Sequence, residues 1–317
     1  MNTFSSSSSR IEWPTLWVMV FCYAIWGFGT TIIYEFSAIL GFIFLTLSIT
    51  LHSSLQHEVI HGHPLPNRWW SEALVFPAVG LFVPYERFKD AHLKHHYDPN
   101  LTDPYEDPES NYLDPKVWNK LSRPIQEILL FNNTLSGRIL IGPAISLLVF
   151  GLEDYRNARS GDWSITRAWI LHLVGIIPVL AWIWLLGTIP LWLYVVSAYL
   201  GFGMLKIRAY LEHRAHEQPR GRTVIINDRG PMAFLFLNNN FHLVHHMQPE
   251  VPWYKLPKHF DSNRERYLQR NEGYQYKNYL EIFRQYFFTK KDPVPHPLWE
   301  NIIHTDDDQK RYTNQLD

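Results

Sequence analysis

The histidines of this chain fall into clusters whose spacing suits metal binding. The pattern H-x-x-H-H occurs twice in 317 residues, as HLKHH at 92–96 and as HLVHH at 242–246. For a chain with 16 histidines, two chance copies would arise in roughly fewer than one chain in a thousand. The preceding residues, RFKDA and LFLNNNF, do not match, so the pattern is not part of a repeat unit. A shared chemical demand explains the two copies better.

Two further clusters extend the set. QHEVIHGH supplies His57 and His61, and YLEHRAHE supplies His213 and His216. Residues three and four apart on a helix share one face, so each cluster can direct two or three imidazoles at one point. Imidazole binds iron, zinc, copper and nickel. A solvated surface position is the usual interpretation of a single histidine, but it does not explain this ensemble.

The number of histidines predicts two metal ions rather than one. Eight candidate ligands lie in three tight clusters: His57, His61, His92, His95, His96, His242, His245 and His246. The EHRAH cluster offers a ninth. A single zinc ion is usually satisfied by four ligands, and an octahedral ion takes six. Eight or nine ligands therefore indicate two ions with four or five protein ligands each.

The composition excludes several other chemistries. The formal net charge is −1, which does not mark a nucleic-acid-binding protein. The single cysteine, Cys22, excludes a disulfide framework, a cysteine-based zinc site and a self-contained iron–sulfur cluster. The chain also has no haem-attachment motif and no G-x-G-x-x-G fingerprint. Electrons for a redox reaction must therefore come from a separate protein.

Long charge-free segments must position these clusters at a membrane. Residues 13–34 and 36–56 contain no charged side chain, and each is about the ~20 residues that a helix needs to cross a bilayer. Residues 168–205 also lack Asp, Glu, Lys and Arg, and they contain Gly187 and Pro190 as turn residues. We therefore expect four transmembrane helices in two hairpins, at about 13–34, 36–56, 168–187 and 189–209.

The distribution of basic residues predicts the orientation. The hairpin turns at 34–36 and 187–190 contain no Lys or Arg, whereas the segments at the other membrane face are rich in both. By the positive-inside rule, those segments are cytoplasmic, together with every histidine cluster and both termini. The shorter apolar stretches 73–85 and 139–152 suit interfacial or re-entrant segments. Residues 1–10 are expected to form a disordered tail, and 261–317 a cytoplasmic C-terminal extension.

Together these motifs resemble the membrane-bound fatty acid desaturase family, whose relatives include hydroxylases and carotenoid ketolases. The resemblance is carried by HEVIH, HLKHH, EHRAH and HLVHH at a membrane border, and by HHYDPNLTDPYEDPES, NNNF and PEVPWYKLP. It covers residues 51–256 or so. It implies an all-α integral membrane protein in which four transmembrane helices, interfacial helices and a cytoplasmic helical cap carry a di-iron site. The desaturase domain would span 11–260.

The resemblance also implies which residues hold the two iron ions. The ligand role passes to the eight histidines named above and to His213, which matches the family's EHR position and lies nearer the helix end than its competitor His216. No further catalytic residue is implied. Acidic and amide residues beside the clusters are candidates to support the ligands, although a loop or cap role is more frequent for such residues: Glu58, Asp98, Asp103, Asp107, Glu212 and Asn238.

The remaining histidines are expected to have ordinary roles. His52 and His172 lie within apolar segments, where a neutral imidazole that is hydrogen-bonded to a neighbour is the favoured interpretation. His259, His296 and His304 have the appearance of surface histidines.

The expected function is an O2-dependent, di-iron desaturation of a fatty acyl chain or a similar lipid. The same centre would support a hydroxylase or ketolase acting on a lipid or small amphiphile. A non-catalytic metal-binding membrane protein is a third interpretation, but transporters often place their ligands near the bilayer midplane, whereas these clusters lie at one border. The implied partners are a lipid substrate and a ferredoxin, rubredoxin or cytochrome with its reductase. HEVIH has three residues between its histidines where animal acyl-CoA desaturases have four, so their substrate preference is not transferred.

Overall fold

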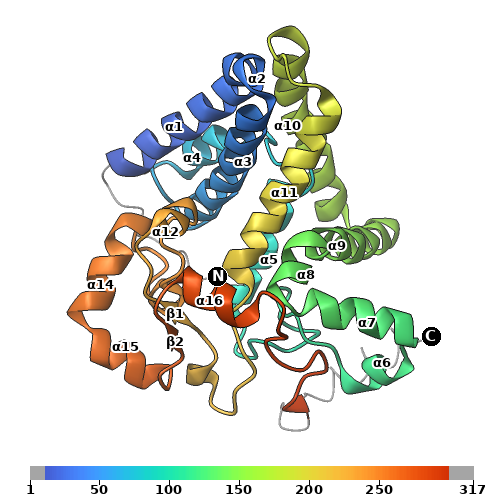
Figure 1. Cartoon of the computed structure of the whole chain (residues 1–317), viewed down its shortest axis with the longest axis vertical. Helices are drawn as coiled ribbons and strands as arrows, with labels where there is room; N and C mark the ends of the chain where they lie inside the picture. The colour runs from blue at the N-terminus through green and yellow to red at the C-terminus, as the bar shows by residue number, and fades with distance from the viewer. Residues whose placement is uncertain (1–10, 300–317) are drawn as a thin grey trace.

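Four long helices form one end of the molecule in the computed structural model, which describes residues 11–299 (Figure 1). They are α1 (Trp13–Thr30), α3 (Ala38–Ile60), α10 (Trp163–Leu185) and α11 (Leu191–Ala209), and the short α2 (Ile32–Phe36) connects α1 to α3. The turn after α10 lies beside the end of α1, because the amide of Thr188 donates to the carbonyl of Thr30 at 2.9 Å. The predicted N-terminal tail and His304 lie outside the described residues.

Local sequence signals explain where these helices begin. Pro14 lies in the first turn of α1, where its missing N–H removes no hydrogen bond from the helix. Ser37 and Asp162 are the N-cap residues of α3 and α10, and their side chains accept hydrogen bonds from the backbone amides of Leu40 and Ser164. Within the described residues, α3 and α10 are both long and apolar enough to cross a membrane. The four-span arrangement remains a prediction, in which α1 and α11 would be the other two spans.

Glycines let α11 pack closely against its neighbours. A Cβ atom on Gly201 would lie 2.9 Å from Cγ2 of Ile49 in α3, and one on Gly203 would lie 2.6 Å from the carbonyl oxygen of Ile139. A real side chain at either position would force the helices apart, so the close approach depends on glycine.

The rest of the chain surrounds the end of the bundle that contains the C-terminal ends of α3 and α11. Its helices are α4 (Arg68–Leu74), α5 (Tyr85–Tyr97), α6 (Pro115–Lys120), α7 (Arg123–Asn132), α8 (Leu135–Leu140), α9 (Gly142–Arg159), α12 (Pro231–Leu235), α13 (His242–Met247), α14 (Leu256–Ser262), α15 (Arg264–Arg270) and α16 (Tyr279–Tyr286). Short 3-10 turns cover Pro219–Gly221 and Trp253–Lys255. The fold is thus mostly helical, as expected. It also contains a parallel pair that the all-helical prediction lacked, β1 (Ile225–Ile226) and β2 (Gln275–Tyr276).

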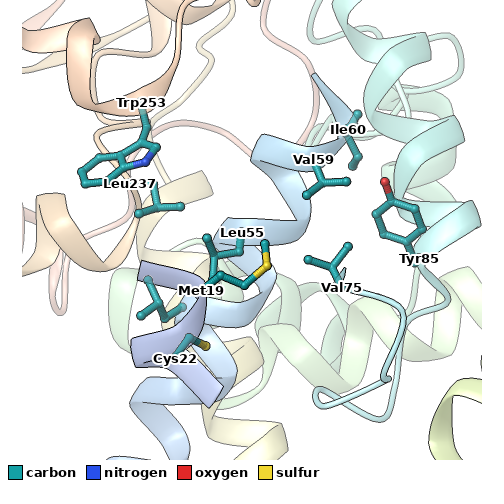
Figure 2. Packing of buried hydrophobic residues seen from close by; sticks show 10 residues of the cluster. Met19, Cys22, Leu55, Val59, Ile60, Val75, Tyr85, Leu237 and Trp253 are labelled. Atoms are coloured by element: carbon teal, nitrogen blue, oxygen red, sulfur yellow. The ribbon is translucent and has the colours of Figure 1, made fainter. Parts of the chain in front are cut away.

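A hydrophobic cluster joins the helical bundle to the surrounding elements (Figure 2). Met19 of α1 and Leu55 and Val59 of α3 pack with Leu237 and Trp253, which come from far along the chain. Trp253 is also held by polar contacts, since its backbone amide donates to Oε2 of Glu58 at 3.1 Å. The PEVPWYKLP segment therefore packs against the end of α3 that carries the first histidine cluster and stabilises it.

Candidate metal centre

Nine histidines from four parts of the chain converge beside the C-terminal end of α3. They form two groups in which the potential ligand nitrogens all lie within 4.8 Å of one another. One group contains His57, His61, His92, His96 and His245, and the other contains His95, His213, His242 and His246. Groups of five and four are compatible with the expectation of four or five protein ligands for each of two ions.

The first group has the dimensions of a metal site. Nε2 of His92 lies 3.0 Å from Nε2 of both His61 and His96, and Nε2 of His96 lies 3.1 Å from that of His245. Two nitrogens about 2.1 Å from one ion and about 90° apart would be separated by about 3.0 Å. The Nε2 atom of His57 is buried and has no hydrogen-bond partner among residues 11–299, as a nitrogen reserved for a metal would be.

The second group repeats these distances. Nε2 of His213 lies 2.9 Å from that of His95 and 3.0 Å from that of His242, and Nε2 of His246 lies 3.1 Å from that of His242. The two groups adjoin, since the rings of His96 and His246 stack with their centroids 4.2 Å apart. The donor set therefore fits two neighbouring ions bound by imidazole.

Burial keeps most of these imidazoles neutral, which is the form that binds a metal. It lowers the pKa of the following residues: His92, His96, His213, His242, His245 and His246. His95 differs. Burial lowers its pKa, but the carboxylates of Glu109 and Asp107 outweigh that effect and raise it to about 9. A metal ion bound at His95 would displace this proton.

Two carboxylates of one loop orient the histidines of α5. Nδ1 of His95 donates to Oδ1 of Asp107 at 2.7 Å, and Nδ1 of His92 donates to Oε1 of Glu109 at 2.9 Å. Such bonds fix the ring and leave Nε2 free for the ion. Asp107 also accepts from the amide of Thr102, which folds the loop around the carboxylate. Asp107 was predicted as a support, whereas Glu109 was missed although it lies in the same Asp- and Pro-rich stretch.

A second support lies beneath His242. Oε1 of Glu212 is 3.6 Å from Nδ1 of His242 and 3.1 Å from Nε of Arg208. Asn239 donates to Glu212 at 2.9 Å, and its own oxygen lies 3.4 Å from Nδ1 of His242. Glu212 was a predicted support. Asn239 was not, because Asn238 was chosen from the same run of asparagines.

The other predicted supports have backbone partners. Asn238 donates to the carbonyl of Trp253 at 3.1 Å, and Asp103 accepts from the amides of Tyr105 and Glu106. Glu58 holds Trp253, and its Oε1 lies 3.9 Å from Nδ1 of the neighbouring His57. Asp98 accepts from the amide of Asn100. The competitor of His213 lies elsewhere too: Nε2 of His216 is 3.5 Å from Glu272.

The histidines outside the clusters behave mostly as expected. His52 is hydrogen-bonded to Tyr23 at 3.1 Å, and His172 to the carbonyl of Leu81 at 2.7 Å. The surface assignment of His296 was wrong, since this side chain is buried and contacts Oγ1 of Thr102 at 3.1 Å. The error arose because the sequence does not reveal that the segment around residue 296 folds back over the 102–113 loop.

A cavity of about 730 Å³ connects the metal centre with the apolar helices. Its lining includes His213 and Glu109 at the centre, and Ile49, Leu81 and Ala198 from the apolar part of the fold. The volume lies in the range of roughly 300–1,000 Å³ that is typical of ligand pockets. The fold thus places a substrate-sized space against His213 of the second histidine group.

Comparison with known proteins places the chain in a family. A search of curated proteins found no match. The family model described as fatty acid desaturase matches residues 34–278, a range that contains all nine histidines and extends beyond the stretch on which the sequence resemblance was based. With its two apolar helices, this match indicates a membrane protein. The chain therefore belongs to the fatty acid desaturase family.

Proposed function

We propose that this protein is an O2-dependent desaturase that introduces a double bond into an acyl chain or a similar amphiphile, using two iron ions. The observation that carries the proposal is the pair of adjoining histidine groups at the end of a largely apolar cavity. The nine proposed ligands are His57, His61, His92, His96 and His245 for one ion, and His95, His213, His242 and His246 for the other. When bound, the iron pair supplies the oxidation of an unactivated C–H bond.

The protein's own residues would prepare the site for this reaction. The imidazoles give each ion neutral ligands, so the carboxylates of Asp107 and Glu109 provide negative charge without contacting the ions. Five of the nine ligands are buried and four are half-buried, which would limit the access of bulk water to the reacting carbon. Apolar residues that line the cavity, such as Ile49 and Ala198, would hold the alkyl chain in one orientation. Electrons would come from a separate ferredoxin, rubredoxin or cytochrome.

Mass spectrometry of lipids from cells with and without the active protein tests the proposal. We expect a product that has lost two hydrogens relative to its precursor, and purified protein with about two iron ions per chain, as five plus four ligands require. The variant His245→Ala should insert into the membrane normally but lose iron and product. A product that gains one oxygen instead would identify a hydroxylase on the same centre. Stable protein that binds no iron in either group would contradict both activities.

A further inference from the structure

Two cations in the wall of the cavity have no carboxylate partner. Arg138 of α8 is only 6% exposed, and both it and Lys206 of α11 line the cavity. Among the described residues their side-chain partners are neutral. Nε of Arg138 donates to the carbonyl of Asn132 at 3.0 Å, Nη1 donates to the side chain of Asn111, and Nζ of Lys206 donates to Oγ of Ser146 at 2.8 Å. Nη2 of Arg138 and two N–H groups of Lys206 remain for a ligand.

Two carboxylates that line the cavity near Lys206, Glu109 and Glu212, are paired with other residues. Glu109 accepts from His92, and Glu212 is paired with Arg208 at 3.1 Å. Both carboxylates interact electrostatically with Lys206, but neither forms an ion pair with it in the described part of the chain. Burying an uncompensated charge costs several kcal/mol or more. Asp292 acts electrostatically on Arg138 in the same way without an ion pair, so an anionic ligand would give both cations a charged partner in contact.

The packing of α8 against α11 brings the two cations of the cavity lining into electrostatic range of each other. Gly203 brings α11 against Ile139, so Lys206, one turn further along α11, approaches Arg138, the neighbour of Ile139 in α8. Figure 1 shows α8 and α9 beside the lower half of α11. Three residues after Lys206 the helix ends, and the next segment carries Glu212 and His213 of the metal centre.

We propose that Arg138 and Lys206 form an anion subsite that binds the ionised carboxylate of the substrate inside the cavity. The substrate would then be a free carboxylic acid rather than an acyl group carried as an ester or thioester. A guanidinium and an ammonium together match the two oxygens of one carboxylate. Glu109 and Glu212, which lie within electrostatic range of Lys206, would repel a dianionic phosphate about twice as strongly as a singly charged carboxylate. This inference rests on the proposed function, because it names the substrate class of the same cavity.

Binding of two probes to the iron-loaded protein in lipid nanodiscs tests the subsite. The probes are dodecanoate and its methyl ester, and native mass spectrometry measures the bound fraction. We expect the wild type to prefer the acid by about tenfold or more, as a lost hydrogen bond to a charged group implies. Arg138→Gln and Lys206→Gln should each remove most of this preference while leaving ester binding unchanged. Lys258→Gln, which removes an exposed cation of α14, is the matched control and should keep the preference.

The conservative variant Lys206→Arg separates a role of charge from a defect of folding, because it should retain the preference. Equal binding of acid and ester by the wild type would overturn the subsite, as would an unchanged preference in both Gln variants. The binding of dodecanoate and the binding of its methyl ester are both measured without turnover. Selective acid binding without any oxidised product would therefore support the subsite while contradicting the desaturase, and a desaturated product with no acid preference would do the reverse.

Discussion

At the scale of single residues, spacing predicted the histidines but not their supports. An i, i+3, i+4 pattern places imidazoles on one helical face whatever the tertiary fold, so the clusters were visible in the sequence. The hydrogen-bond partners depend on how a loop returns. The carboxylate of Asp107 accepts hydrogen bonds from the backbone amides of Thr102 and Glu109, so the loop folds around it. This loop conformation places Glu109 in contact with His92. No local pattern distinguishes Glu109 from Asp103, which caps a turn in the same stretch.

Replacing Glu109 by Gln should weaken iron binding by about 10–100-fold, because the bond from Nδ1 of His92 would lose its negative partner. Iron retained after dialysis against a graded chelator series measures the change. Asp103→Asn is the matched control in the same loop, and it should leave iron affinity nearly unchanged. If both variants lose iron equally, the loop fold rather than the bond to His92 is responsible.

At the scale of elements, two of the long helices, α3 and α10, run beyond the charge-free windows that predicted them. The second window ended at 56, but α3 continues to Ile60 and so carries His57 on its last turn. The third began at 168, but α10 begins at Trp163. In both cases a charged residue, Glu58 or Arg167, ended the window without ending the helix. A charged residue at the border of the apolar region does not interrupt the hydrogen bonds of a helix, but it ends a window that is defined by the absence of charge.

The glycine contact between α11 and α8 gives a prediction about stability. Gly203→Ala should lower the free energy of unfolding by about 1–3 kcal/mol, because the added Cβ would lie 2.6 Å from the carbonyl of Ile139. Gly151→Ala is the control in α9, where a Cβ meets nothing within 4 Å, and it should stabilise the protein by about 0.5–1 kcal/mol. Thermal unfolding in detergent measures both. A neutral effect of Gly203→Ala would mean that the two helices separate without cost.

The buried His296 predicts a pH-dependent contact between the C-terminal segment and the 102–113 loop. Burial, aided by Arg222, lowers its pKa from 6.5 to about 4. Since the folded pKa is below the unfolded one, the folded state binds fewer protons there. This contribution to stability is complete above pH 6.5 and is lost as the pH falls through 4.

Hydrogen exchange of the amides of Leu113 and His296, which bond across this contact, should therefore accelerate between pH 6.5 and 4 beyond the intrinsic change. His296→Gln keeps a polar partner for Thr102 but cannot titrate, so it should lose much of the pH dependence. An identical pH profile in the variant would show that His296 does not cause the effect.

At the scale of the whole molecule, the surface is divided as expected of a membrane protein. Large apolar side chains stand exposed on α3 and α10 and at the hairpin end, where Trp184 is 88% and Phe36 is 85% exposed. The two hairpin turns meet at this end through the bond between Thr188 and Thr30. The histidine groups lie around the opposite end of α3. The sequence predicted this division from charge, but the cavity that links its two sides depends on packing between distant segments and was not predictable.

The predicted orientation, with the hairpin turns external and the histidine groups cytoplasmic, can be tested with single cysteines because the native Cys22 is buried. Glu35 lies at the first hairpin turn and Lys258 lies on α14, and both are exposed. A membrane-impermeant maleimide should label Glu35→Cys in intact cells, and it should label Lys258→Cys only after permeabilisation. The reverse pattern would invert the orientation. Labelling of both cysteines in intact cells would place the two positions on the same face, which would contradict four spans in two hairpins.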